Sequence, residues 1–251
     1  MSQKTFNDVF KGKTVLVTGH TGFIGSWLTL WLKYLGANII GYSLNPPTDP
    51  SLFDILNLDN EITNVTSDIR DKKKLFETVK KYEPEFVFHL AAQSLVRDSY
   101  ENPLDTFEIN VLGTANVLDV LRFSSSVKVA LIMTSDKCYD NKINDRVHVE
   151  DDPMGGIDPY SASKGAAELI TSSYRNSFFD TGDHRMSVST IRAGNILGGG
   201  DWAKDRIIPD SIRAIIKNQN IRIRNPDSIR PWQYVLEPIS GMLWLARKMH
   251  S

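Results

Sequence analysis

The sequence predicts an α/β fold in which a doubly wound parallel sheet carries helices on both faces. Over residues 14–191, short runs rich in β-branched and aromatic residues alternate with longer amphipathic stretches, as strands alternate with crossover helices. A glycine-rich turn lies between the first such run and the stretch after it. Strands that alternate with helices form parallel sheets, because each crossover places a helix on one face of the sheet.

Each expected element follows from its local pattern. The continuous apolar run Thr14–Thr18 predicts a buried strand, and Gly36 ends the helix after it. The expected strands are Thr14–Thr18, Asn38–Tyr42, Phe86–Leu90, Val127–Thr134 and Ser187–Ile191. The expected helices are Ser26–Leu35, Lys72–Tyr82, Leu104–Phe123, Tyr160–Phe179 and Pro238–Met249. The turn-rich segments Pro46–Pro50 and Glu150–Pro159 are expected as loops at the carboxyl ends of strands, where such sheets bind ligands.

Composition is that of an ordinary globular protein and argues against several partners. Of the 251 residues, 41% are hydrophobic and 24% are charged, and the net charge of −1 provides no basic surface for nucleic acid or membrane. The sequence has no run of about 18 apolar residues that would span a membrane, and the polar residues 1–13 do not resemble a signal peptide. The single cysteine, Cys138, cannot form an internal disulfide, so we expect a reducing compartment, the cytoplasm.

Three glycines after the first expected strand indicate a dinucleotide site. Gly19, Gly22 and Gly25 form the pattern G-x-x-G-x-x-G and open the first helix. Glycine permits the tight turn, lets backbone N–H groups approach a pyrophosphate and allows close contact between helix and strand. A turn that merely needs positive φ is the alternative, but the strand before and the helix after these glycines favour the site. We therefore predict a Rossmann-type dinucleotide-binding domain over residues 1–194.

The alternation of strands and helices breaks after residue 194. Gly198–Asp201 reads GGGD, and short apolar runs lie beside arginines at Ile221–Ile223 and Tyr234–Leu236. We interpret residues 195–251 as part of a smaller substrate-binding region that is interleaved with the sheet.

Two positions bear on the adenosine half of the dinucleotide. An acidic residue that binds the ribose is expected about 20 positions after the glycines, at the end of the second strand. Ser43 stands there and no arginine follows, so this position does not decide between NAD and NADP, and we expect weak binding of the ribose. Asp68 is placed to meet the adenine edge. Its alternative role, capping the helix Lys72–Tyr82, suits Asp71 better.

A tyrosine and a lysine supply the candidate redox chemistry. Tyr160 and Lys164 are four residues apart on one expected helix, so they share a face. The lysine is expected to lower the pKa of the tyrosine, which then takes a proton from a hydroxyl as hydride leaves the same carbon. Ser135, at the end of the fourth strand, is expected to hydrogen-bond the same oxygen. An ordinary surface pair is the alternative for Tyr160 and Lys164, and Ser135 together with the glycine turn makes it less favoured.

These features together resemble the extended short-chain dehydrogenases/reductases, the NAD-dependent epimerase/dehydratase family. The resemblance rests on the glycine turn, His89–Gln93 (HLAAQ), the strand-end serine and the Y-x-x-x-K pair, and it covers essentially the whole chain. Within the family, longer strings resemble the 4,6-dehydratases that act on CDP-glucose. These strings are Gly19–Leu28, Asn45–Thr48, His89–Val96, Thr134–Tyr139, Asp158–Leu169, Arg192–Asp210 and Ile229–Pro238.

The resemblance implies an NAD-dependent hydro-lyase that oxidises CDP-glucose at C4, removes water across C5 and C6 and returns hydride to C6. Relatives acting on dTDP- or GDP-sugars carry aspartate-glutamate after the serine or threonine, whereas this chain has Asp136-Lys137. Lys137 would remove the C5 proton if burial or nearby Lys164 depresses its pKa, and Asp136, held protonated, would protonate the departing hydroxyl. A solvated loop pair is the alternative for these two residues. Alternatives to the dehydratase are a sugar-nucleotide epimerase or reductase, which does not need Asp136-Lys137, and an inactive nucleotide-binding protein.

The resemblance also assigns binding residues. The implied NAD-binding residues are Gly19, Gly22, Phe23, Ile24, Gly25, Asp68, Ile69, Leu90, Ala91, Ala92, Asn110, Tyr160 and Lys164. Asn110 corresponds to an asparagine that orients the tyrosine. The implied substrate-binding residues are Asn195, Arg206, Arg224 and Arg230, because guanidinium groups suit phosphate oxygens, whereas Arg222 is interpreted as a rim charge.

Other residue types are expected to serve the structure. Cys138 is interpreted as a small buried residue, and His20 and His89 lack metal-type spacing, so no metal is expected. Trp202 and Trp232 are expected to pack in the substrate-binding region. Relatives of this kind are longer and dimerise through two long helices. We therefore expect an incomplete substrate-binding region and a homodimer formed by Leu104–Phe123 and Tyr160–Phe179.

Overall fold

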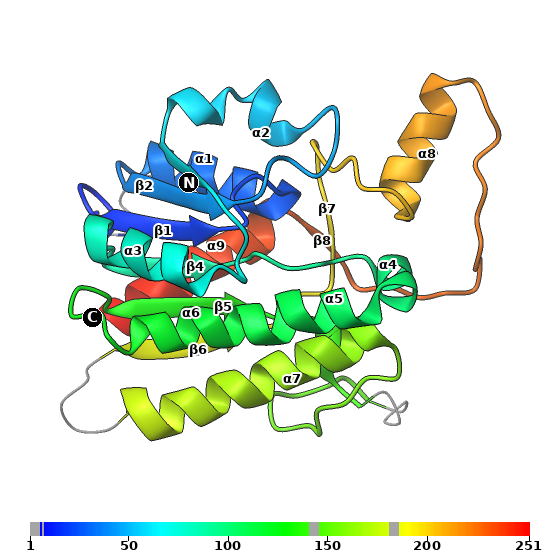
Figure 1. Ribbon diagram of the computed structural model, residues 1–251. Coiled ribbons are helices and arrows are strands. Elements are labelled where there is room, and N and C mark those ends of the chain that lie inside the picture. Colours follow the sequence, from blue (N-terminus) through cyan, green and yellow to red (C-terminus); the bar gives the residue numbers. More distant parts are fainter. Residues whose placement is uncertain (1–5, 7, 141–145, 181–185) are drawn as a thin grey trace.

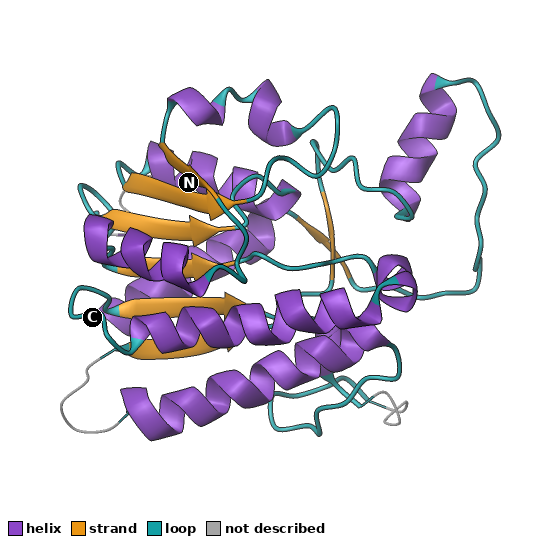
Figure 2. Cartoon of the chain, in the orientation of Figure 1, coloured by secondary structure: helices purple, strands orange, loops and turns teal. Residues whose placement is uncertain are grey.

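The main sheet is fully parallel and lies between two layers of helices (Figures 1 and 2). The computed structural model describes residue 6 and residues 8–140, 146–180 and 186–251, so residues 1–5 and 7 of the polar N-terminal segment lie outside it. The sheet has six strands in the order β3-β2-β1-β4-β5-β6. They are β1 Thr14–Thr18, β2 Asn38–Ser43, β3 Thr63–Thr66, β4 Phe86–His89, β5 Val129–Met133 and β6 Ser187–Ile191. The doubly wound α/β fold expected from the sequence is confirmed.

Strand β1 is the point where the chain changes direction across the sheet. It pairs with β2 on one side, with Val15 opposite Ile39, and with β4 on the other, with Val15 opposite Phe86. The chain completes β2 and β3 on one side before it crosses back to β4, β5 and β6. A crevice opens at the carboxyl ends of strands at such a point, and there open α/β sheets bind their ligands.

The five helices expected from the sequence are present among the described residues, one of them divided in two, and three further helices, α2, α4 and α8, were not expected. The α-helices are α1 Phe23–Tyr34, α2 Leu52–Ile55, α3 Lys72–Tyr82, α4 Val96–Glu101, α5 Pro103–Phe107, α6 Gly113–Leu121, α7 Pro159–Tyr174, α8 Ile207–Ile216 and α9 Leu236–His250. The π-turns are η3 Glu108–Leu112, which joins α5 to α6, and η5 Arg175–Phe179, which extends α7; the 3-10 turns are η2 Leu58–Asn60 and η4 Asp136–Cys138. Helix α1 begins three residues earlier than expected, because Gly22 already has the extended backbone of an N-cap.

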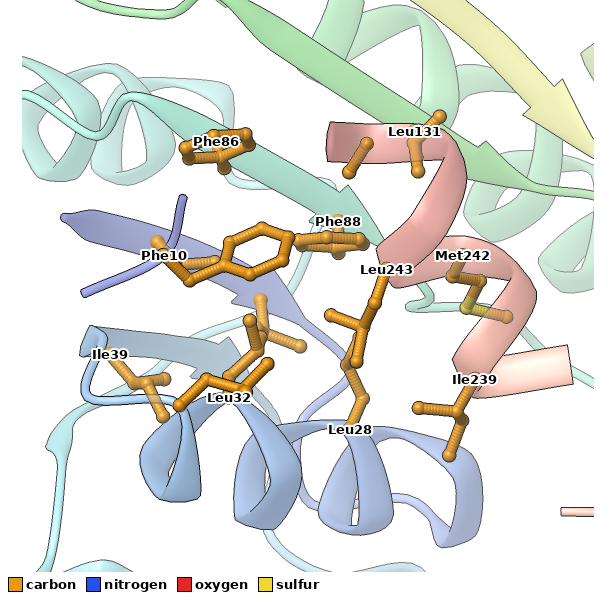
Figure 3. Packing of buried hydrophobic residues seen from close by; sticks show 14 of the residues in the cluster. Phe10, Leu28, Leu32, Ile39, Phe86, Phe88, Leu131, Ile239, Met242 and Leu243 are labelled. Atoms are coloured by element: carbon orange, nitrogen blue, oxygen red, sulfur yellow. The ribbon is translucent and has the colours of Figure 1, made fainter. Parts of the chain in front are cut away.

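Two hydrophobic layers hold the sheet between the helices. Alternate residues of a strand point to opposite faces, so Phe86 and Phe88 pack on one side and Val87 on the other. The first layer joins the sheet to α1 and α9, where Leu28 and Leu243 are fully buried (Figure 3). Burial of each such leucine or phenylalanine side chain contributes about 1.5–3 kcal/mol. The opposite layer packs against α3, α6 and the end of α7.

Residues 195–251 divide between a peripheral part and the core. Strands β7 Asn195–Leu197 and β8 Trp232–Tyr234 form a separate parallel pair, and α8 between them stands away from the main body (Figure 1). Helix α9 returns to the sheet and buries Leu243 and neighbouring apolar residues in the same layer as α1. Helix α9 therefore packs with the dinucleotide-binding region, although it follows residue 194. The domain boundary at residue 194 stays a prediction. Within the described ranges, no helix has both the length and the apolar character needed to cross a membrane.

Candidate functional site

A cavity of about 470 Å³ lies at the carboxyl ends of the strands beside the glycine turn. Ten of the expected cofactor residues line it: Gly19, Gly22, Phe23, Ile24, Gly25, Asp68, Ile69, Leu90, Ala91 and Ala92. The cavity is also lined by Thr21, by the loop 93–95 after β4 and by the loop 200–203. These residues lie in strings that resemble the family, but they were not among the expected binding residues. The loop 93–95 begins with Gln93, the last residue of the HLAAQ string, so the sequence pattern could have indicated it. The loop 200–203 comes from the far end of the chain, and only the tertiary fold brings it here.

The glycine turn fits a dinucleotide because two of its glycines have no room for a side chain. Gly19 has φ +73°, and a Cβ there would come within 2.6 Å of the Ala91 nitrogen. A Cβ on Gly25 would come within 2.1 Å of the Gly19 oxygen. Gly22 caps α1 without any side-chain hydrogen bond to the first N–H groups of the helix. These free N–H groups and the positive end of the α1 dipole suit a pyrophosphate.

At the ribose position, Ser43 ends β2 as the sequence predicted, and its side chain has a local partner. The Ser43 hydroxyl lies 2.9 Å from the Thr21 hydroxyl, and Thr21 Oγ1 donates to the carbonyl of Leu44 at 2.9 Å. Both Ser43 and Thr21 line the cavity. The site therefore offers hydroxyl groups where the common pattern offers a carboxylate.

Asp68 also lines the cavity and is held by an arginine. Arg70 pairs with the Asp68 carboxylate at 2.7 Å and with Asp105 on α5 at 2.6 Å. The hydrogen bond from Arg70 holds the pKa of Asp68 below its usual value. Asp71, as expected, caps α3 by accepting from the Lys74 N–H at 2.9 Å. Asp68 is thus free of the capping role and fixed at the cavity wall.

The candidate redox residues meet at the start of α7. Tyr160 and Lys164 lie on successive turns, and the Tyr160 side chain is hydrogen-bonded to Ser135 at the end of β5. Lys164 is buried, and its Nζ donates to the carbonyl of Met133 at 3.2 Å. Burial lowers the pKa of Lys164 to about 8.

The pKa of Tyr160 differs in direction from the expectation. Burial raises it, because a phenolate loses hydration inside the protein, and this effect exceeds the opposing influence of the Ser135 hydrogen bond and the Arg206 charge. The Lys164 ammonium is directed to the Met133 carbonyl. In this structure, the lysine therefore does not produce the lowered tyrosine pKa that the Y-x-x-x-K spacing predicted.

Asp136 and Lys137 lie on the turn η4, directly after Ser135. Ser135 caps this turn by accepting from the Lys137 N–H at 3.2 Å, and its hydroxyl donates to Asp136 at 3.0 Å. Lys137 Nζ forms an ion pair with Asp136 at 2.9 Å, and both side chains are partly exposed. The structure thus contains the paired arrangement that the sequence left open as the alternative. The same arrangement places both groups beside the serine that contacts Tyr160.

Asn110 is linked to Tyr160 through a hydrogen-bonded serine, Ser163. It is buried in the π-turn η3, and its amide nitrogen donates to the Gln93 carbonyl and to Ser163 Oγ, both at 2.9 Å. Ser163 Oγ in turn donates to the backbone carbonyl of Tyr160 at 2.7 Å. Asn110 therefore reaches the tyrosine through its backbone, by way of Ser163, and does not line the cavity itself.

Of the four expected substrate residues, one lines the cavity. Arg206 lines the cavity and donates to Ser94 at 3.1 Å and to Asp201 at 3.2 Å. Arg224 and Arg230 are exposed; the first pairs with Asp205 and the second donates to its neighbouring carbonyl. Asn195 lies on β7, outside the cavity lining. Trp202 lines the cavity, whereas Trp232 on β8 is 43% exposed.

The remaining candidates are packed as neutral groups. Burial raises the pKa of the Cys138 thiol to about 12, which makes it a poor nucleophile. Burial lowers the pKa of His20 to about 4 and that of His89 to about 3, so both rings are uncharged near neutral pH. His89 lies 2.7 Å from Thr18 Oγ1 and 3.1 Å from Thr114 Oγ1. Across the described ranges, His, Cys, Asp and Glu do not gather in a group of three or more that could hold a metal ion.

The glycine turn, Ser135 and Tyr160 all lie within the part of the chain that matches one large family. Residues 15–251 match the model of the "NAD dependent epimerase/dehydratase family". The chain belongs to this family. NAD is accordingly its cofactor, and the glycine turn and cavity have the shape and hydrogen-bonding groups to hold it.

Individual family members are similar over most of the chain. A CDP-glucose 4,6-dehydratase of Salmonella typhimurium is 51% identical over 245 residues, which is 96% of this chain and 68% of that protein. A dTDP-D-glucose 4,6-dehydratase of Dictyostelium discoideum is 27% identical, over 96% of this chain and 57% of its own length. An epimerase structure from Methanothermobacter thermautotrophicus has a TM-score of 0.83 at 27% identity, covering 96% of this chain and 69% of that one. The family acts on sugar nucleotides. This chain spans about two thirds of the length of the Salmonella typhimurium dehydratase.

Proposed function

We propose that this protein dehydrates CDP-glucose to CDP-4-keto-6-deoxyglucose, with NAD used and regenerated in each turnover. One observation carries the proposal: Ser135 contacts both the redox tyrosine, Tyr160, and the turn η4. This turn carries the proposed acid and base, Asp136 and Lys137, and is called the acid/base turn below. The Ser135 hydroxyl is hydrogen-bonded to Tyr160 on one side and to Asp136 on the other. A single sugar at Ser135 can therefore meet both sets of groups. The similarity to the Salmonella typhimurium CDP-glucose 4,6-dehydratase supports the choice of substrate.

The residues divide the reaction between two ends of the sugar. Tyr160 accepts the proton of the C4 hydroxyl, and Ser135 holds the same oxygen. NAD, when bound at the glycine turn, would supply the hydride acceptor that C4 oxidation requires. The C4 ketone makes the C5 proton acidic, so Lys137 removes it while Asp136 protonates the hydroxyl that leaves C6 as water. Return of hydride to C6 and of the proton to C5 completes the 4-keto-6-deoxy product.

This division requires the Asp136–Lys137 ion pair to open when substrate binds. An ion pair joins an ammonium to a carboxylate, whereas the proposed base must be neutral and the proposed acid must carry a proton. Movement of one proton from Lys137 to Asp136 in a site closed to water gives both groups the needed form. We infer that the substrate, by covering the partly exposed pair, supplies that closure.

The remaining roles are proposed from position. Arg206, at the cavity wall beside Ser94, is proposed to hold a phosphate of the sugar nucleotide. The ten expected residues that line the cavity are proposed to hold NAD. Asn110 is proposed to orient the helix that carries Tyr160. With hydroxyl groups at the ribose position, we expect NAD to dissociate readily, so it should not co-purify in full. Three further residues are proposed for the substrate side from the family resemblance alone: Asn195, Arg224 and Arg230.

We also propose a cytoplasmic homodimer formed by the helices α5, η3 and α6 together with α7. Leu104, Leu112 and Leu169 on these helices are 70%, 57% and 63% exposed. Large apolar side chains exposed on helices in this way are candidates for an interface.

One incubation distinguishes the dehydratase from its alternatives. The protein is mixed with CDP-glucose and NAD under anaerobic conditions, and the alkaline absorbance of a 4-keto sugar is followed. A dehydratase generates the signal with catalytic NAD. An epimerase or reductase leaves C6 oxygenated, and an inactive nucleotide-binding protein generates nothing. Either of these last two outcomes rejects the proposed function.

A further inference from the structure

A buried ion pair lies behind the candidate site, on groups to which the proposed chemistry gives no role. Glu168 on α7 and Arg192, just after β6, are joined by two hydrogen bonds, from Arg192 Nε at 3.0 Å and from Arg192 Nη2 at 2.9 Å. Glu168 is only 5% exposed. Burial alone would raise the pKa of Glu168, but hydrogen bonds from Arg192, Thr134 and Thr190 hold it below the usual value. The carboxylate is thus charged, buried and fully engaged.

The pair contacts both ends of the segment that carries the acid/base turn. Thr134, directly before Ser135, donates its hydroxyl to Glu168. Tyr139, directly after the turn η4, accepts from Arg192 Nη1 at 3.0 Å, and the guanidinium lies 5.0 Å from the centre of its ring. Between these two anchors, the Asp136 N–H donates to the carbonyl of Ala193 at 3.1 Å, next to Arg192 in the chain. The segment 134–139 is therefore held at three residues, Thr134, Asp136 and Tyr139, by the Glu168–Arg192 pair and the adjacent Ala193 carbonyl.

The same pair is fixed to the helix that carries the redox residues. Glu168 follows Lys164 by four residues and Tyr160 by eight, so all three lie along one face of α7. The charge of Glu168 also acts on the buried Lys164. A shift of α7 relative to the turn η4 would have to break or bend the Glu168–Arg192 hydrogen bonds.

We propose that Glu168 and Arg192 are positioning residues that set the acid/base turn in register with the redox helix, so that Asp136 and Lys137 meet C5 and C6 while Tyr160 meets C4. This inference rests on the proposed function, because it assigns the pair to the coordination of the two halves of that reaction. The effect of the pair is on the elimination, since the turn is the smaller and more exposed of the two elements that it joins. A pair that only stabilised the fold would support both steps equally.

Two variants that each remove one hydroxyl from this network test the inference. Tyr139→Phe removes the hydrogen bond on the turn side and keeps the ring beside Arg192. Thr190→Val is the matched control, because Thr190 on β6 donates to Glu168 at 2.8 Å from the sheet side. In single turnover with CDP-glucose and NAD, absorbance of NADH reports C4 oxidation, and solvent-deuterium exchange at C5 reports the next step. Misplacement of a reacting group by a fraction of an ångström costs roughly tenfold in rate.

We expect the ratio of C5 exchange to NADH formation to fall roughly tenfold in Tyr139→Phe, so that bound NADH accumulates, and to change less than about twofold in Thr190→Val. Arg192→Lys, which keeps the charge for Glu168 but cannot reach Tyr139 at the same time, should show the same selective loss. Equal ratios in Tyr139→Phe, Arg192→Lys and Thr190→Val overturn the inference and leave the proposed function standing. A wild-type protein that oxidises C4 but never releases a 4-keto-6-deoxy sugar overturns the proposed function instead, and the inference with it.

Discussion

Tyr160 illustrates how the surroundings of one residue decide its chemistry. Spacing alone suggested that Lys164 lowers the tyrosine pKa, but burial acts in the opposite direction and is the larger effect. Ser135 and the charge of Arg206 oppose the burial without overcoming it. The proton transfer therefore depends on what binds in the cavity, because the positive charge of an oxidised nicotinamide favours the phenolate. Burial in the protein alone thus favours the protonated phenol of Tyr160.

The first prediction tests this residue directly. Tyr160→Phe removes the group that takes the C4 proton and keeps the ring, so folding and nucleotide binding should persist while turnover falls roughly 10²–10⁴-fold. Formation of the 4-keto sugar is the measurement, and fluorescence titration with NAD checks binding. Tyr174→Phe, at the far end of the same helix, is the control and should retain turnover. Near-normal turnover in Tyr160→Phe would remove the tyrosine from the mechanism.

The second prediction concerns two buried histidines and acid stability. The pKa values of His20 and His89 are about 4 and about 3 in the fold, below the ordinary 6.5 of an unfolded chain. The unfolded state therefore gains protons first as the pH falls. The stability that these neutral rings contribute is complete above pH 6.5 and is lost toward pH 3–4, at up to about 1.4 kcal/mol per pH unit for each ring. Urea unfolding at pH 7 and pH 5 measures the slope. His89→Gln should roughly halve it, and an unchanged slope would contradict the assignment.

At the scale of elements, the helix α7 could be predicted from periodicity, whereas the turn η4 could not. Helix α7 was predicted from its periodicity, and Asp158 caps its start by accepting from the Ser161 N–H. The turn η4 is three residues long and has no periodicity, so its residues could be singled out from the sequence but its conformation could not be predicted. Its conformation follows from the Ser135 cap and from distant contacts. The turn that carries the proposed acid and base is thus the element that the local sequence predicts least well.

The third prediction addresses that turn. Lys137→Met keeps the bulk of the side chain and removes the base, so loss of water should stop while C4 oxidation continues. Bound NADH should then accumulate in a single turnover, and deuterium exchange at C5 should disappear. Arg222→Met, which removes an exposed cation interpreted as a rim charge, is the control and should leave both signals unchanged. If Lys137→Met still released the 4-keto-6-deoxy sugar at an ordinary rate, the base would lie elsewhere.

At the scale of the whole molecule, sequence reasoning succeeded where short-range patterns decide the structure. Strands β1 and β6 and helix α3 have the predicted bounds, because their apolar periodicity and the Asp71 cap are local. Helices α2 and α4 were missed, since segments this short depend on their surroundings more than on propensity. The return of α9 to the sheet, the cavity wall at residues 200–203 and the Glu168–Arg192 pair all join distant parts of the chain. Tertiary packing alone determines them.

The fourth prediction concerns assembly. A homodimer through α5, η3, α6 and α7 would cover Leu112 and Leu169, and a stable interface buries at least about 1,000 Å². Light scattering should then report twice the chain mass of 28.3 kDa. Leu169→Asp places an unpaired charge in the interface and should yield monomers. Ile215→Asp is the matched control: its side chain on α8 is 61% exposed, similar to Leu169, but lies outside the proposed interface. Monomeric wild-type protein would reject the dimer, and dissociation by Ile215→Asp but not by Leu169→Asp would move the interface to α8.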